Sequence, residues 1–223
     1  MTKLVLSNSK SLAKIQHFPA THGITTENFI NFNNRQNSEE TQKNLLLMKT
    51  VKGNSFYKAI TRHEAKIIQV NLNGQIDNYF IGDALFCFRP KNNSRPVLIT
   101  NTADCPIVFM TDVAENFVGI IHSGRQETEM NIVGKTIAKL GIIYDIQASE
   151  IIIGIWPGIC QYCYPINLQK IIIGQLLEAG INGLDIHTAK NTCSAHSTYK
   201  NEFLFSSFRR EKSENRNAAF ITF

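Results

Sequence analysis

Several side chains that can do chemistry occur among small and turn-forming residues of this chain. Cys105 lies between two apolar runs, His122 ends the next run, and Cys160 and Cys163 follow a third. A cysteine and a histidine at neighbouring strand ends can ligate Zn²⁺ and leave positions for a third ligand and a water. Alternatively, His122 could deprotonate Cys105 and make it a nucleophile for acyl transfer or deamidation. If these residues have no functional role, Cys105 is a buried core residue that lies beside a histidine of the core.

The remaining cysteines and histidines form weaker patterns. Cys160-x-x-Cys163 could be a redox pair or half of a zinc site, but no second CxxC is present in the sequence. His187 and His196 flank Cys193 without a spacing that indicates metal ligands. These patterns do not outweigh the cysteine and histidine at the neighbouring strand ends.

The elements that position these residues alternate between strands and helices. Apolar residues at helical spacing predict helices over 39–48, over 127–140 and from Asn167 to just before Gly180. The continuously apolar Ile151–Ile155 predicts a strand at the centre of a sheet. Together they favour the α/β (α+β) class, as a single-domain sandwich with a central mixed β-sheet flanked by helices. Short β-branched and aromatic runs predict the other strands, at Lys66–Val70, Asp83–Phe88, Val97–Thr100, Pro106–Met110 and Phe117–Ile121.

The composition excludes several classes of protein. The 223 residues are 43% hydrophobic and 18% charged, so the chain is neither disordered nor dominated by charge. Its longest apolar run is shorter than the ~20 residues of a membrane span, and we expect a soluble, cytoplasmic protein without a membrane partner. Five cysteines are an odd and sparse set, unlike a disulfide framework. Acidic residues dilute the one basic cluster, at Arg209–Arg216, so no nucleic-acid partner is expected.

An ordered set of motifs resembles the laccase-domain (multicopper polyphenol oxidase-like) family. Thr102-Ala-Asp-Cys-Pro-Ile is similar to its TADC signature, and His122-Ser-Gly is similar to the start of its HAGWRG element. The resemblance covers most of the chain, which implies one laccase-domain-like domain over residues 1–223. Further matches are His22-Gly23, Gly82-Asp83-Ala84-Leu85, Pro157-Gly158-Ile159, Cys163-Tyr164, Leu177-Glu-Ala-Gly-Ile, Cys193, and Phe205-Ser with Arg209-Arg210 through Arg216.

The resemblance implies a zinc-dependent purine nucleoside phosphorylase with adenosine deaminase activity. Its metal ligands would include Cys105 and His122, and its substrates would be a purine nucleoside and phosphate. The family's third ligand is the histidine of a Q-x-H element, which we align with Gln69-Val70-Asn71. An amide oxygen is a hard, neutral ligand, so Asn71 predicts weakened zinc binding. His63 is the nearest histidine, but nothing in the sequence aligns it with the ligand.

Further site residues follow from the same resemblance. Besides the cysteine and the histidine, Asp83 and Asp104 are predicted to be catalytic and to position the base or the ribose. Each aspartate could equally accept hydrogen bonds from backbone amides at a turn. Arg125 is the candidate for phosphate, and Asn71 is counted with it among the substrate-binding residues.

Other functions remain open from the sequence. With a zinc ligand replaced, Cys105 could act as the nucleophile of a metal-free Cys–His hydrolase or amidase. A non-catalytic relative that keeps only the fold is a third possibility. Copper-dependent phenol oxidation is less favoured, because one cysteine and one histidine do not build the several copper sites of laccase chemistry.

Overall fold

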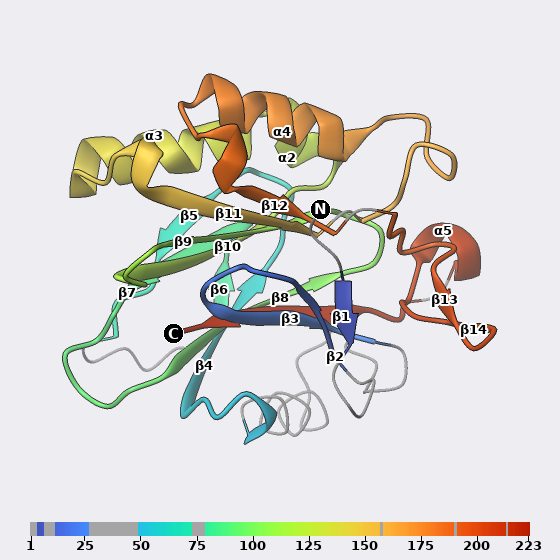
Figure 1. Cartoon of the computed structure of the whole chain (residues 1–223), viewed down its shortest axis with the longest axis horizontal. Coiled ribbons are helices and arrows are strands. Elements are labelled where there is room, and N and C mark those ends of the chain that lie inside the picture. The colour runs from blue at the N-terminus through green and yellow to red at the C-terminus, as the bar shows by residue number, and fades with distance from the viewer. Residues whose placement is uncertain are drawn as a thin grey trace.

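Two β-sheets pack face to face, and helices cover the outer face of one of them (Figure 1). A computed structural model of the chain describes residues 4–6, 12–26, 49–72, 79–156, 158–189, 191–212 and 214–223. The helix expected over 39–48 lies outside the described residues.

The seven-stranded sheet carries strands from both ends of the described chain. Its order is β1-β2-β3-β15-β8-β4-β6. Strand β15 lies between β3 and β8 and is antiparallel to both, with Ala219 opposite Ile24 on one side and opposite Thr100 on the other. The bounds are β1 (Leu4–Leu6), β2 (Leu12–Ile15), β3 (Thr21–Thr25), β4 (Ser55–Ile60), β6 (Tyr79–Ile81), β8 (Pro96–Thr102) and β15 (Asn217–Thr222).

The six-stranded sheet lies between the seven-stranded sheet and the helices (Figure 1). Its order is β12-β11-β9-β10-β7-β5, with parallel pairs at both edges and antiparallel pairs within. The bounds are β5 (Ile67–Gln69), β7 (Ala84–Phe88), β9 (Ile107–Asp112), β10 (Phe117–His122), β11 (Ile151–Trp156) and β12 (Ile186–Thr188). A separate hairpin pairs β13 (Thr198–Tyr199) with β14 (Glu202–Phe203).

Asparagine side chains cap the N-termini of the two longer helices. Asn131 accepts a hydrogen bond from the Gly134 amide (3.1 Å), and Asn167 accepts one from the Lys170 amide (3.0 Å). Both bonds satisfy an amide in the first helical turn, which has no partner within the helix. The helices are α2 (Arg125–Glu129), α3 (Ile132–Tyr144), α4 (Leu168–Glu178) and α5 (Phe208–Glu211), with short 3₁₀ turns at Ala148–Glu150 and Gly183–Asp185.

The side chains of β10 alternate between two buried faces, which explains why this strand is apolar throughout. Val118 and Ile120 pack in the core between the two sheets, whereas Phe117 and Ile121 pack in the core beneath α3 and α4. Since successive strand residues point to opposite faces, a sheet buried on both faces needs apolar residues at every position. The same alternation puts His122 on the inter-sheet side, beyond Ile120.

The predicted α+β sandwich is confirmed, and the structure adds a second large sheet to the one expected. The predicted strands are present, but β11 lies between β12 and β9, next to the edge of its sheet instead of at its centre. The predicted helix over 127–140 is two helices, because Asn131 adopts a left-handed conformation (φ 55°) between them. The second continues past Gly141 to Tyr144. Among the described residues, no helix is long and apolar enough to cross a membrane.

A buried histidine in β3 makes the stability of the protein sensitive to acid. The His22 Nε2 atom accepts a hydrogen bond from the Ile15 amide (2.9 Å), and its Nδ1 contacts the carbonyl oxygen of Ala20 (2.8 Å). Burial lowers the pKa of His22 from 6.5 to about 4, and the opposing hydrogen bond to Ala20 is too weak to restore it. A protonated ring could no longer accept from Ile15.

We therefore expect the free energy of unfolding to fall as the pH drops from 6.5 towards 4. Between these two pH values the unfolded chain binds a proton that the folded chain does not. The stabilisation is therefore complete above pH 6.5 and is lost progressively as the pH falls to about 4. The loss attributable to His22 is on the order of 3 kcal/mol. Urea unfolding across this window measures it, with His22→Gln as the comparison. Equal pH dependence in both proteins would contradict the assignment.

Candidate functional site

Cys105 and His122 come together because two strand ends meet. The loop between β8 and β9 carries Cys105, and His122 is the last residue of β10, opposite Ile107 at the start of β9. The loop is fixed on both sides, since the Thr102 hydroxyl donates to the Cys105 carbonyl oxygen (2.7 Å) and the Ser123 amide donates to that of Pro106 (2.9 Å). The side chains of Cys105 and His122 lie close to each other, on either side of Gly124.

A buried carboxylate on α2 joins His122 to a second histidine. The Oε1 atom of Glu127 lies 2.8 Å from Nδ1 of His122 and 2.8 Å from Nδ1 of His63. The two imidazole rings are 5.5 Å apart between centroids. His63, His122 and Glu127 thus form a group that could hold a metal ion. The other oxygen of Glu127, Oε2, is buried and has no hydrogen-bond partner among the described residues.

Gly124 keeps this group compact. A Cβ atom on Gly124 would lie 2.8 Å from Sγ of Cys105, 3.1 Å from Oε2 of Glu127 and 3.4 Å from Cε1 of His122. The thiol, the unpartnered carboxylate oxygen and the imidazole therefore surround one small volume. A side chain at position 124 would occupy this volume and push the three groups apart.

The charged forms of His122 and Glu127 stabilise each other. Burial opposes the charged form of His122, but the charge and hydrogen bond of Cys105, together with those of Glu127, outweigh it and raise the pKa of His122. Burial likewise opposes ionisation of Glu127, but the hydrogen bond and charge of His122 lower its pKa. The structure therefore favours a carboxylate beside an imidazolium, with the thiol in contact with that imidazolium.

The structure does not bring Asn71, the residue predicted at the third ligand position, to Cys105 and His122, and it places His63 beside His122 instead. Strand β5 runs parallel to β7, with Ile67 opposite Ala84, and Ala84 in turn lies opposite Ile121 beside His122. Residues before β5 therefore lie at the His122 end of the sheet. Residues after β5 lie at the other end, ~13 Å away along β7. Counting along the strand thus separates Asn71 from Cys105 and His122.

Asp83 holds the loop that presents His63. Its Oδ1 accepts hydrogen bonds from the amides of Arg62 and His63 (3.0 Å each), and its Oδ2 accepts from those of Glu64 (3.0 Å) and Lys66 (3.2 Å). The carboxylate is buried, and its oxygens are engaged by these backbone donors. These contacts match the alternative left open by the sequence, in which Asp83 accepts hydrogen bonds from backbone amides at a turn, and its catalytic role stays a prediction.

Asp104 ties the C-terminal part of the chain to the Cys105 loop. Its Oδ1 accepts from the Ser194 hydroxyl (2.7 Å), its Oδ2 from the Arg209 amide (2.8 Å), and its carbonyl oxygen from the Ile159 amide (2.7 Å). It adopts a left-handed conformation (φ 85°), which a non-glycine residue keeps only where its surroundings impose it. Asp104 therefore positions the Cys105 loop, and its catalytic role stays a prediction.

A cavity of about 150 Å³ opens beside Cys105. Two arginines line it, and Arg125, predicted as a substrate-binding residue, is one of them. Arg209 is the other, with its guanidinium 4.8 Å from the ring centre of Tyr164. Cationic and aromatic groups therefore border the same cavity as the thiol. Its lining is Ala103, Asp104, Cys105, Arg125, Ile159, Tyr164, Leu168, Phe208 and Arg209.

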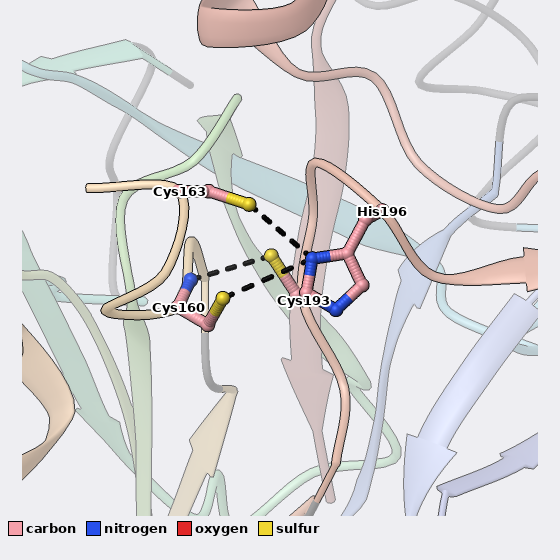
Figure 2. Close-up of side chains that lie close together, drawn as sticks. All are labelled: Cys160, Cys163, Cys193 and His196. Carbon is pink, nitrogen blue, oxygen red and sulfur yellow. Dashed lines mark hydrogen bonds between the residues drawn. The ribbon is translucent and has the colours of Figure 1, made fainter.

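A second group of ligand-type side chains lies behind this cavity, and sequence reasoning missed it. Cys160 and Cys163 in the turn after β11 face Cys193 and His196 from the segment before β13 (Figure 2). Their four ligand atoms lie within 4.8 Å of one another, so the group could hold a metal ion. We call these four residues the Cys₃His cluster.

Comparisons with known proteins agree with this fold. A sequence model of the family described as multi-copper polyphenol oxidoreductase laccase matches residues 21–169. A protein of Clostridium acetobutylicum named purine nucleoside phosphorylase is 28% identical, over 88% of this chain and 89% of that protein. The solved structure of YlmD from Geobacillus stearothermophilus superposes with a TM-score of 0.83 at 20% identity, over 99% of this chain and 98% of that one. The YfiH protein of Bacillus licheniformis superposes with a TM-score of 0.82 at 20% identity, over 98% of both chains.

Proposed function

Because the chain belongs to the multi-copper polyphenol oxidoreductase laccase family, we propose that it is an enzyme that acts on purine nucleosides. It uses phosphate to cleave the bond between base and ribose, and it also deaminates adenosine. The observation that carries the proposal is the group of His63, His122 and Glu127, with the Cys105 thiol next to it, beside a cavity bordered by arginines and aromatic rings. The name of the Clostridium relative supports the substrate class.

The residues present fit a zinc ion. One thiol and two imidazoles are the soft and borderline donors that zinc takes in proteins, and the unpartnered Oε2 of Glu127 calls for a cation nearby. Cys105, His122 and His63 would hold the metal, and Glu127 would orient both imidazoles through Nδ1, as carboxylates behind metal-ligating histidines do. A bound zinc ion supplies Lewis acidity and lowers the pKa of a coordinated water. Copper is less favoured, because this donor set makes one site and not several.

The cavity supports a purine nucleoside and phosphate as the ligands. At about 150 Å³ it is smaller than typical whole-ligand pockets of ~300–1,000 Å³. It therefore suits one part of the substrate, with a flat base against the rings of Tyr164 and Phe208. Arg125 and Arg209 would pair with phosphate through charge-assisted hydrogen bonds at the cavity edge. Nothing in this arrangement calls for a nucleic acid or a membrane as partner.

The test is release of free base from inosine or adenosine, with and without phosphate, by the untagged protein. Base release that depends on phosphate, and ammonia release from adenosine, are the expected results. Cys105→Ala should lower both rates roughly a hundredfold or more, whereas the matched change His187→Ala, outside the site, should leave them unchanged. Base release that persists in Cys105→Ala would overturn the proposal.

The contact of Cys105, His122 and Glu127 supports a second candidate function, a metal-free Cys–His hydrolase. A thiol beside an imidazolium that a carboxylate orients is the arrangement of cysteine nucleophiles. A chelator separates the candidates, since it would abolish the zinc-dependent reaction and leave a thiol hydrolase active. A thiol hydrolase would also be inactivated by iodoacetamide at Cys105 without any change in metal content.

A further inference from the structure

The Cys₃His cluster joins two chain segments that the sequence separates widely. Cys160 and Cys163 lie in the turn after β11, and Cys193 and His196 precede the β13–β14 hairpin (Figure 2). The Nδ1 atom of His196 lies 3.3 Å from Sγ of Cys163 and 3.8 Å from Sγ of Cys160. All three sulfurs and this nitrogen therefore face one point.

These separations match a tetrahedral zinc site. With Zn–S bonds of about 2.3 Å and Zn–N bonds of about 2.0–2.1 Å, tetrahedral geometry puts ligand atoms about 3.5–3.8 Å apart. The distances to His196 lie close to this range, and no pair of ligand atoms exceeds 4.8 Å. A metal ion would thus require only small movements of the side chains.

Two backbone amides hold the sulfur of Cys193 in place within the cluster. This buried sulfur accepts hydrogen bonds from the amides of Cys160 (3.3 Å) and Ala195 (3.4 Å). In a zinc site three thiolates would face one another, and a divalent cation would supply the counter-charge that relieves their repulsion.

Two other interpretations account for less of the cluster. Packing does not explain it, because Cys163 and His196 are exposed to solvent. A redox pair would use Cys160 and Cys163 alone and would leave the approach of Cys193 and His196 without a role. Four ligand-type side chains from two segments are explained together only by a shared ligand.

The cluster lies directly behind the cavity beside Cys105. The Ile159 amide donates to the carbonyl oxygen of Asp104 (2.7 Å), and the Ser194 amide donates to that of Gly158 (2.9 Å). Tyr164, which lines the cavity, follows Cys163 directly. A bond between the two segments would therefore fix one wall of the cavity.

We propose that Cys160, Cys163, Cys193 and His196 bind one Zn²⁺ in a closed, structural site that braces the cavity wall. Four protein ligands leave no open position, so this zinc takes no part in catalysis. The site is separate from the one at Cys105 and does not depend on the activity proposed above.

The test is zinc content per chain, by mass spectrometry, in untagged full-length protein purified without chelator. Cys105→Ala combined with His63→Ala removes a thiol and an imidazole from the other candidate zinc site, and in this background we expect one zinc per chain. Adding Cys163→Ser or His196→Ala should remove it, whereas the matched change His187→Ala should not. Cys163 is exposed, so its replacement by serine removes a ligand without opening a cavity.

A second measurement keeps the proposal testable if these variants fold poorly. In the Cys105→Ala protein, added Zn²⁺ should protect Cys160, Cys163 and Cys193 together from iodoacetamide, and a chelator should abolish the protection. Absence of zinc after its addition, or zinc that survives both ligand substitutions, would overturn the proposal. A Cys160–Cys163 disulfide, with no zinc bound even after the disulfide is reduced, would support a redox pair instead.

Discussion

Replacement of Asp83 by asparagine is expected to lower the free energy of unfolding by about 3 kcal/mol or more. The buried carboxylate accepts four backbone hydrogen bonds, two on each oxygen. An asparagine keeps one acceptor oxygen and turns an NH₂ group towards the other two amides. Two backbone donors, now in partly buried hydrogen bonds, would then lack acceptors and face a third donor, at a cost of about 1–3 kcal/mol for each unsatisfied group.

The matched control for this prediction is Asp112→Asn. Asp112 also accepts a backbone hydrogen bond, from the Asn116 amide (2.7 Å), but it is only partly buried, and an amide oxygen can replace that acceptor. We expect its effect to stay within about 0.5 kcal/mol. Denaturant unfolding of both variants and the wild type measures the difference. If the two variants unfold at the same midpoint, Asp83 does not hold the loop as described.

Replacement of Gly124 by alanine is expected to lower kcat/KM for the proposed nucleoside reaction by roughly a hundredfold. The backbone at Gly124 (φ −70°, ψ −169°) suits any residue, so the effect comes from crowding alone. The new Cβ would lie 2.8 Å from the Cys105 sulfur, closer than such atoms approach in proteins. The thiol must move away from His122, while overpacking costs about 1–3 kcal/mol of stability.

Gly174 offers the matched control for Gly124. It lies within α4, and a Cβ there would meet no heavy atom within 4 Å. Gly174→Ala should leave the activity unchanged and raise stability by about 0.5–1 kcal/mol, since alanine is favoured over glycine inside a helix. Activity assays and thermal unfolding of both variants provide the measurement. Wild-type activity in Gly124→Ala would show that the crowded position does not belong to the site.

The strands that position the site could be predicted from the sequence, because both faces of the six-stranded sheet are buried. Continuous apolar runs at β9, β10 and β11 follow from that burial, and the neighbouring strand ends place Cys105 near His122. The strands of the seven-stranded sheet near the chain ends were not predicted. Strand β15, with two alanines and a central place between β3 and β8, owes its pairing to contacts distant in sequence.

The second part of the site was missed for reasons that can be named. A search for a second CxxC overlooked Cys193-x-x-His196, which completes a Cys-x₂-Cys and Cys-x₂-His pattern with Cys160 and Cys163. His63 was unassigned because the end of β5 at which it lies depends on parallel pairing with β7, which local sequence does not reveal. Glu127 could not be predicted from the motif, because it occupies the position at which the family's HAGWRG element has its final glycine.

The central place of β15 has a consequence for how the chain is made. On the ribosome, β3 and β8 emerge well before residues 217–222, and until then each has an unpaired edge in the middle of the seven-stranded sheet. Exposed edges of this kind pair readily with other chains. A nascent chain stopped before residue 217 is therefore an aggregation-prone intermediate, because the sheet cannot close until β15 has been synthesised.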